Sequence, residues 1–208
     1  MVRDMSLDVS VVPVPAGLAY FNYQLEGIRF LLEHEGALLA DEMAVGKTVQ
    51  AIGLINALPS ISSVLIVCPA TMKLVWKREL EKWLAKPFFY IALVDSTWQP
   101  ADIVIINYDR LHQYTKELSA RVWDLIICDE SHYLKTPTVR RTKIATSLKA
   151  KRRIALSGTY ALSIGIPQSN IVSFNADGVG VRLVLDRLSK SMRAYQLGDR
   201  QYALRLRN

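Results

Sequence analysis

The chain has 208 residues, half of them hydrophobic, which is enough to bury a sizeable core in one large domain or in a domain with an extension. Its apolar runs are soon interrupted, and its first residues lack the basic start and long apolar core of a signal peptide. These features exclude a membrane-spanning protein and predict no membrane partner. We expect a cytoplasmic location in a bacterial or phage-infected cell, or a nuclear one in a eukaryote.

The net charge of +7 is distributed unevenly along the chain. Residues 1–130 carry 11 basic and 16 acidic side chains, whereas residues 131–208 carry 15 basic and 3 acidic ones. This asymmetry points to an anionic partner for the second part, most simply nucleic acid, with a basic face exposed only to solvent as the alternative. Cys68 and Cys128 each lie in an apolar run, so we expect buried, reduced thiols.

Short apolar strands alternate with helical patterns as far as about residue 158. In chain order the pattern predicts helix 23–34, strand 37–40, helix 47–58, strand 64–68, helix 72–84, strands 89–94 and 103–106, helix 109–118, strand 125–128, helix 139–148 and strand 154–156. Continuous apolar strands separated by helices are typical of an α/β fold with a mostly parallel sheet and helices on both faces. Beyond residue 159 the rhythm is lost, and 178–197 fits one basic helix.

The most informative stretch is LLADEMAVGKT, over residues 38–48. An apolar strand leads into a tight turn that ends in Gly-Lys-Thr at the head of a predicted helix. Backbone N–H groups at such a helix start bind phosphates, the lysine supplies a positive charge to the β/γ oxygens, and the threonine hydroxyl can ligate Mg²⁺. The expected ATP-binding turn comprises Asp41, Glu42, Met43, Ala44, Val45, Gly46, Lys47 and Thr48. Because Asp41 and Ala44 stand where glycines are common in such turns, an incidental turn is the alternative.

A second signal, Asp129 followed by Glu130, comes directly after another apolar strand. Open parallel sheets bind ligands at the carboxyl ends of their strands, so both acids should lie at the same edge as Lys47. We expect Asp129 to hold Mg²⁺, directly or through water, and Glu130 to orient and deprotonate an attacking water. A general base of this kind is worth ~10²–10⁴ in rate. The alternative is two acids on a surface turn, and His132 either couples this site to the next motif or caps the turn.

Gln24 is a candidate for reading the base of a nucleotide. It lies about 20 residues before the phosphate-binding turn, close to the aromatic residues Phe21 and Tyr23. An aromatic ring can stack on adenine, and a glutamine can pair with the adenine amino group and N7. Packing at the start of a helix is the alternative.

Two further groups are candidates for contact with nucleic acid. Pro69, Ala70 and Thr71 precede a helix that carries Lys73, Trp76, Lys77 and Arg78. Helix starts and hydroxyl groups contact phosphates, but acidic residues on the same helix leave a solvated face of mixed charge as the alternative. The densest basic cluster either flanks a nucleic-acid track or faces solvent: Arg140, Arg141, Lys143, Lys149, Lys151, Arg152 and Arg153.

Taken together and in order, the motifs resemble the first RecA-like lobe of the Snf-type DNA-dependent ATPases of helicase superfamily 2, in particular the annealing-helicase branch. The segments that carry the resemblance are YQLEG (23–27), LLADEMAVGKT (38–48), LIVCPATMKLVWKREL (65–80), INYDRL (106–111), LIICDESHYLKTP (125–137) and IALSGT (154–159). The resemblance covers about residues 18–160. It implies an N-terminal extension over 1–17, a RecA-like ATP-binding lobe over 18–159 and a basic tail over 160–208.

The resemblance implies ATP hydrolysis with Mg²⁺, coupled to movement on duplex or branched DNA in repair, recombination or fork processing. By position, Gln24 would read adenine, Lys47 and Thr48 would bind phosphates and metal, and Asp129 and Glu130 would serve metal and water. The remaining roles are a DNA contact for Pro69, Ala70 and Thr71, and a coupling of hydrolysis to DNA movement for His132, Ser157, Gly158 and Thr159.

The chain also departs from the family pattern. Ala44 and Val45 replace the usual Gly and Leu, and Tyr160 stands where a proline usually follows Ser-Gly-Thr. Family members carry a second RecA-like lobe with an arginine finger, for which about 49 residues after Thr159 are too few. Since an arginine finger is worth ~10³–10⁵ in rate, we expect weak ATP binding and near-background turnover from a split or truncated lobe that needs a partner chain. A non-catalytic nucleic-acid-binding module that keeps the P-loop fold is the alternative.

Overall fold

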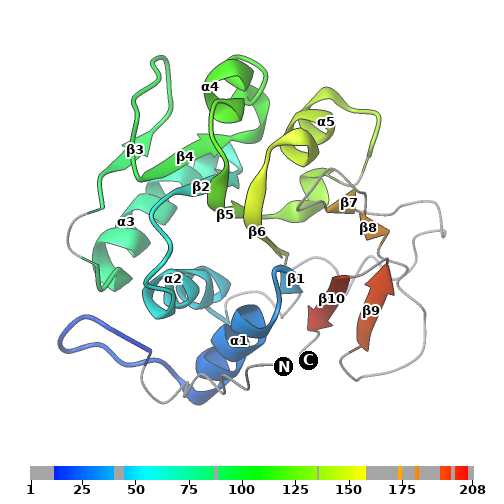
Figure 1. The fold of residues 1–208 in the computed structure, drawn as a ribbon. Helices are drawn as coiled ribbons and strands as arrows, with labels where there is room; N and C mark the ends of the chain where they lie inside the picture. The colour runs from blue at the N-terminus through cyan, green and yellow to red at the C-terminus, as the bar shows by residue number, and fades with distance from the viewer. Residues whose placement is uncertain are drawn as a thin grey trace.

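The structure, a computed structural model, describes residues 12–39, 45–86, 89–134 and 136–157, and the backbone of four short strands beyond them (Figure 1). The strands are β1 Gly36–Leu39, β2 Val64–Cys68, β3 Ile91–Leu93, β4 Ile103–Asn107, β5 Trp123–Cys128, β6 Ala150–Leu156, β7 Ser173–Phe174, β8 Val181–Arg182, β9 Arg193–Leu197 and β10 Arg200–Arg205. The helices are α1 Asn22–Glu33, α2 Lys47–Ala57, α3 Lys73–Trp83, α4 Thr115–Ser119 and α5 Arg140–Ser147. Short 3-10 turns are η2 Ala70–Met72, η3 Tyr108–Arg110 and η4 Ser131–Leu134.

The main sheet has the strand order β3-β4-β2-β5-β6-β1-β10-β9. The first six strands are parallel to their neighbours, β10 is parallel to β1, and β9 is antiparallel to β10. Strands β2, β4 and β5 are buried along their whole length, as their continuous apolar runs predict for a sheet covered on both faces. The expected α/β class with a mostly parallel sheet is therefore confirmed.

Helices cover both faces of this sheet. Helices α1, α2 and α3 lie on one face, and α4 and α5 lie on the other (Figure 1). Successive residues of one strand serve opposite cores, so that Ile66 packs with Leu54 of α2 and its neighbour Val67 belongs to the cluster of Leu118 from α4. Within the described residues, none of the helices has the length and apolar character needed to span a bilayer.

The carboxylate of Asp124 ties together the amino ends of three neighbouring strands. It lies on β5 and accepts hydrogen bonds from the backbone N–H and hydroxyl groups of Ser62 and Ser63, which precede β2, at 2.8–3.1 Å. Lys151 of β6 lies 2.7 Å away on its other oxygen. Burial raises the pKa of the Asp124 carboxyl, but the hydrogen bonds from Lys151 and the two serines outweigh it and hold the pKa well below its usual range.

We therefore predict that Asp124→Asn destabilises the fold by about 1–3 kcal/mol, because it removes a charged acceptor that five donors share. Since the folded pKa is depressed, the contribution of Asp124 is present above its unfolded pKa of about 4 and is lost as the pH falls below that value. In urea unfolding, the free energy of unfolding should fall less between pH 7 and pH 3 in Asp124→Asn than in wild type. Equal losses would contradict this role.

The single helix expected over 109–118 is wrong. The chain instead forms the turn Tyr108–Arg110 and the five-residue helix Thr115–Ser119. The hydroxyl of Thr115 donates to the carbonyl oxygens of Leu111 (3.0 Å) and His112 (3.3 Å). These carbonyls therefore accept a side-chain hydrogen bond, which competes with the backbone hydrogen bonds of a continuous helix.

The single helix expected over 178–197 is also wrong where the structure describes that range. Strand β8 lies near its start, and β9 occupies its end and pairs with β10 so that Leu197 faces Arg200. Only Gly198 and Asp199 separate the two strands in sequence, which is a turn signal for a two-residue hairpin that the periodicity argument overlooked.

Candidate nucleotide-binding site

Parallel strands bring the predicted motifs to one edge of the sheet. The neighbouring strands β2, β5, β6 and β1 all run in the same direction, so the residues that follow them emerge together at their carboxyl ends. Two backbone hydrogen bonds continue the ladders to this edge, from Asp129 N–H to the carbonyl of Val67 (2.8 Å) and from Ser157 N–H to the carbonyl of Leu39 (3.1 Å). Residues 41–44 and 158–159 of the predicted site lie outside the described residues.

Gly46 begins helix α2 in a conformation that favours glycine. Its φ is +75° and its ψ is 37°, and its carbonyl accepts the N–H of Gln50 at 3.0 Å. A Cβ atom at this position would lie 2.6 Å from Nε2 of Gln24, so the side chain of Gln24 packs directly against the turn. Lys47 and Thr48 are the first two residues of α2, at the end of the helix that attracts anions.

Gln24 is buried and its amide oxygen accepts the N–H of Phe21 at 3.0 Å. This bond caps the start of α1, and it leaves the amide nitrogen directed at Gly46. The rings of Phe21 and Tyr23 stack 5.5 Å apart and nearly parallel, and Phe21 is 64% exposed. The structure thus shows the packing of Gln24 at the start of a helix and also places this residue beside the predicted phosphate-binding turn.

Asp129 is buried at the end of β5 and is held by three hydrogen bonds. Trp76 Nε1–H donates to its Oδ2 (2.8 Å), the N–H of Glu130 donates to its Oδ1 (2.9 Å), and the Tyr108 hydroxyl donates to its carbonyl oxygen (2.7 Å). Burial raises the pKa of the Asp129 carboxyl, and the Trp76 hydrogen bond and the positive charge of Lys47 oppose that rise. Lys47 and Asp129, which are 82 positions apart, therefore lie within electrostatic reach of each other.

Glu130 has a backbone conformation that is unusual for its residue type. Its φ of +47° is in the left-handed region, which costs about 1–3 kcal/mol for a residue other than glycine. Its Oε2 lies 3.1 Å from Nδ1 of His132, but these two buried atoms are not aligned for a hydrogen bond and have no other hydrogen-bond partner. Strained backbone and unpaired buried polar atoms occur preferentially at functional sites.

His132 lies on η4 and contacts an aromatic stack. Its ring is 4.9 Å from the ring of Tyr133, which stacks on Tyr108 at 5.2 Å. Arg141 of α5 donates to the carbonyl of Tyr133 at 2.9 Å. His132 therefore lies between Glu130 and Tyr133, whose backbone carbonyl accepts from Arg141 of α5.

The segment after β2 reaches the same edge of the sheet. Ala70 and Thr71 are exposed and Pro69 is half-buried. In the helix that follows, two of the candidates for contact with nucleic acid point into the protein: Lys73 is buried against Asp95 and the carbonyl of Val94, and Trp76 is fully buried. Lys73, Trp76 and Leu80 form the inner face of α3, whereas the apolar Leu74 and Val75 are exposed.

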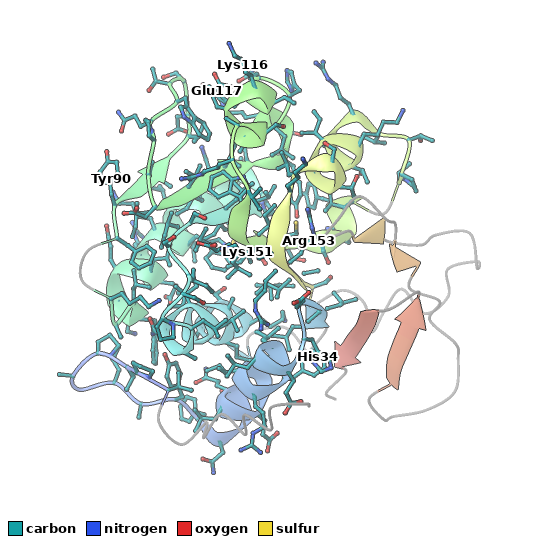
Figure 2. The ribbon with its side chains drawn as sticks, viewed as in Figure 1. His34, Tyr90, Lys116, Glu117, Lys151 and Arg153 are labelled. Atoms are coloured by element: carbon teal, nitrogen blue, oxygen red, sulfur yellow. The ribbon has the colours of Figure 1, made fainter. Side chains whose placement is uncertain are left out.

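Three members of the basic cluster are structural. Arg152 donates to the carbonyls of Leu31, Leu32 and His34 at the end of α1 (2.9–3.3 Å), and the buried Arg153 donates to those of Ala145 and Leu148 at the end of α5 (2.6 Å each). Lys151 pairs with Asp124, as described above, and Figure 2 labels Lys151 and Arg153 beside β6. Their guanidinium and ammonium groups are thus engaged with the fold, although the Lys151 side chain is 70% exposed. Arg140, Lys143 and Lys149 are exposed as well.

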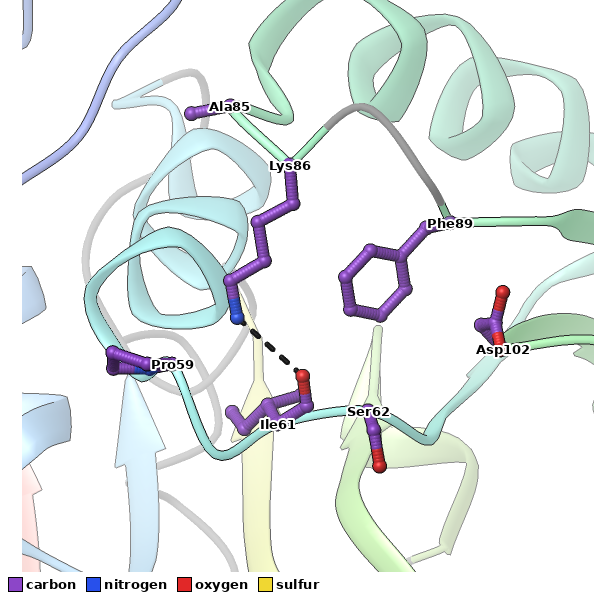
Figure 3. A pocket seen from close by; sticks show the side chains of 7 residues that line it. All are labelled: Pro59, Ile61, Ser62, Ala85, Lys86, Phe89 and Asp102. Atoms are coloured by element: carbon purple, nitrogen blue, oxygen red, sulfur yellow. Dashed lines mark hydrogen bonds between the residues drawn. The ribbon is translucent and has the colours of Figure 1, made fainter.

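A cavity of about 470 Å³ lies at the opposite edge of the sheet. It is lined by Ile61, Lys86, Phe89 and Asp102, among others (Figure 3). The Lys86 ammonium donates to the carbonyls of Leu58 (2.7 Å) and Ile61 (3.4 Å). Because this cavity is at the amino ends of β2 and β4, it is separate from the edge where Lys47 and Asp129 lie.

Sequence reasoning missed the roles of Trp76 and Tyr108. Trp76 was grouped with the basic residues of its helix, and Tyr108 was not considered as part of the site. The spacing of Lys73, Trp76 and Leu80 along one helix face is the signal that predicts burial of Trp76, and a buried indole N–H needs an acceptor. Nothing in the sequence alone identifies that acceptor as Asp129.

The sheet order and the Gly-Lys-Thr helix start define a P-loop lobe of the RecA type. The chain belongs to the SNF2-related domain family, which matches it over residues 23–160. This finding confirms the resemblance to Snf-type ATPases of helicase superfamily 2.

Several relatives show the extent of the match. The chain is 40% identical over 154 residues to a SWI/SNF-related matrix-associated actin-dependent regulator of chromatin subfamily A-like protein 1 homolog of Caenorhabditis elegans, covering 69% of this chain and 22% of that protein. It is 34% identical over 163 residues to the DNA repair and recombination protein RAD54B of Gallus gallus, covering 66% and 18%. The chain thus spans about a fifth of the length of these relatives.

Among solved structures, the Sulfolobus solfataricus SWI2/SNF2 ATPase core in complex with dsDNA is similar, with a TM-score of 0.63 and 28% identity. The alignment covers 68% of this chain and 32% of that one.

We predict that Gly46→Ala destabilises the chain more than Gly17→Ala does. Both glycines have positive φ, +75° and +83°, so both substitutions impose similar backbone strain. A Cβ at position 17 meets nothing within 4 Å, whereas one at position 46 collides with Gln24. The difference between the two variants in the free energy of unfolding, measured with urea, gives the cost of the collision with Gln24. Combining Gln24→Ala with Gly46→Ala should recover part of the stability that Gly46→Ala loses. Equal losses in the two single variants would show that Gln24 does not pack on the turn.

Proposed function

We propose that this chain is the ATP-binding lobe of a DNA-dependent ATPase of the Snf type. The observation that carries the proposal is the parallel arrangement of β1 and β5 in one sheet, which brings Lys47, at the start of the helix that follows β1, and the buried Asp129, at the end of β5, to the same edge. A positive charge at a helix start and a carboxylate near it are what a metal-bound nucleotide phosphate needs.

The residues at this edge fit ATP and Mg²⁺. Among the described residues, no group of three or more His, Cys, Asp or Glu side chains gathers as a complete metal site, and Mg²⁺ typically takes one or two carboxylates and completes its shell with phosphates and water. Asp129 and the Thr48 hydroxyl would hold the ion, which when bound would neutralise phosphate charge. Lys47 would bind the β/γ oxygens, and the carboxylate of Glu130, whose Oε2 lies 3.1 Å from His132 Nδ1, would orient and deprotonate the attacking water.

The base of the nucleotide would lie against the start of α1. Gln24 directs its amide nitrogen toward the turn, and the exposed ring of Phe21 lies beside it in a stack with Tyr23. An exposed, nearly flat pair of rings suits stacking on adenine. The predicted turn residues Asp41, Glu42, Met43, Ala44 and Val45 complete this binding surface in the proposal.

Duplex or branched DNA is the proposed macromolecular partner. One similar solved structure is a complex with dsDNA, and bovine ZRANB3, which is 32% identical over 167 residues, is a DNA annealing helicase and endonuclease. Pro69, Ala70 and Thr71 would contact the DNA backbone, since they reach the nucleotide edge and two of them are exposed. Ser157, Gly158 and Thr159, with His132, would link hydrolysis to movement. The chain would then act in the nucleus of a eukaryote or the cytoplasm of a bacterium.

Turnover would require the rest of such an ATPase core. The chain aligns with 32% of the archaeal core, and an arginine finger from another lobe is worth ~10³–10⁵ in rate. The proposal therefore assigns nucleotide binding to this chain and assigns hydrolysis to its assembly with a second lobe, in the same or another polypeptide.

Titration calorimetry with Mg²⁺–ATP tests the binding proposal. Lys47→Ala should weaken binding at least ~10-fold, because one lost charge-assisted phosphate contact is worth about 1.5–3 kcal/mol. Lys77→Ala is the matched control, since it removes a lysine whose partner is Glu81 on the outer face of α3. If Lys47→Ala binds like wild type, Lys47 does not contact the phosphates as proposed. If wild type binds no nucleotide, the result favours the alternative, a non-catalytic nucleic-acid-binding module that keeps the P-loop fold.

A coupled phosphate-release assay tests whether this chain needs a second lobe to hydrolyse ATP. We predict that the chain alone hydrolyses ATP near the background rate with or without duplex DNA, and that Glu130→Gln changes that rate little. A duplex-stimulated rate typical of complete translocases would contradict the need for a second lobe.

A further inference from the structure

Trp76 is a buried core residue that also contacts the candidate site. It lies one turn into α3, has no exposed surface, and directs its only polar group at the carboxylate of Asp129. Trp123 offers a comparison within the same chain, because it is equally buried and donates to an ordinary backbone carbonyl, that of Leu118, at 3.0 Å. Both indoles satisfy their N–H, but only Trp76 does so on the acid proposed to hold the metal.

Tyr108 holds the same residue from the other side. It is almost fully buried at the end of β4 and its hydroxyl donates to the Asp129 carbonyl at 2.7 Å. Two strands and a helix therefore converge on Asp129: β4 through Tyr108, α3 through Trp76, and β2 through the carbonyl of Val67.

We infer that Trp76 and Tyr108 are positioning residues that fix the Asp129 carboxylate for Mg²⁺. The last side-chain torsion of an aspartate is broad, so an unrestrained carboxylate rotates freely. Here Oδ2 accepts from Trp76 and Oδ1 accepts from the Glu130 N–H, which sets the plane of the carboxylate and leaves each oxygen further acceptor capacity. Groups that orient a metal ligand in this way typically change metal affinity 10–100-fold when they are removed.

This inference rests on the proposed function, and the Mg²⁺ dependence of ATP affinity tests it separately. ATP affinity is measured by calorimetry in excess Mg²⁺ and in excess EDTA. Trp76→Phe keeps an aromatic ring but removes the N–H, so it should reduce the affinity gained from Mg²⁺ about 10-fold and leave the affinity in EDTA unchanged. Tyr108→Phe, which removes a single hydroxyl, should reduce the gain in the same direction.

Trp123→Phe is the control for the loss of a buried indole. It removes a comparable ring and a comparable hydrogen bond away from the site, so it should lower the melting temperature and leave the gain from Mg²⁺ intact. If Trp76→Phe does not fold, 3-benzothienylalanine at position 76 removes the N–H at nearly constant shape and should give the same reduced gain.

A full gain from Mg²⁺ in the position-76 variant, or an equal reduction in Trp123→Phe, would overturn the inference while the proposed function stands. A wild-type chain that binds no nucleotide in either condition would overturn both.

Discussion

The parallel alignment of β2, β5, β6 and β1 is the constraint on which the candidate site depends. The Gly-Lys-Thr, Asp129-Glu130 and Ser157 motifs each follow one strand and are distant in the sequence. They lie at one edge in space because these strands are aligned. The alignment in turn depends on continuous apolar runs that can be buried on both faces, with α1, α2 and α3 on one side and α4 and α5 on the other. Burial of the strands and assembly of the site are thus consequences of the same apolar pattern.

The two edges of the sheet have different physical character. At the amino edge, three charged groups bond to the fold: Asp124 accepts from two serines and Lys151, and Arg152 and Arg153 cap the ends of α1 and α5. At the carboxyl edge, Glu130 has a strained backbone and an oxygen without an aligned hydrogen bond, and Asp129 is buried with a raised pKa. The edge proposed to bind a ligand thus holds a strained residue and a buried acid.

The motifs and the alternation of strands and helices along the chain could be predicted from the sequence because their signals are local. Gly46, Lys47, Asp129 and Glu130 each stand next to an apolar strand, and the rule that parallel strands end together placed them at one edge. The partners of buried polar groups were not predictable in this way. Arg153 read as part of a basic surface, and its contact with the end of α5 depends on tertiary packing. Trp76 is the same case, since helical spacing predicts its burial but not its acceptor.

The location of a bound nucleotide tests the central claim most directly. In a crystal structure with Mg²⁺ and a non-hydrolysable ATP analogue, we expect the β/γ-phosphates at Lys47, the metal within reach of Asp129 and the base beside Gln24. A nucleotide bound elsewhere, for example in the cavity beside Lys86, or phosphates that contact Lys47 while the metal lies away from Asp129, would contradict it.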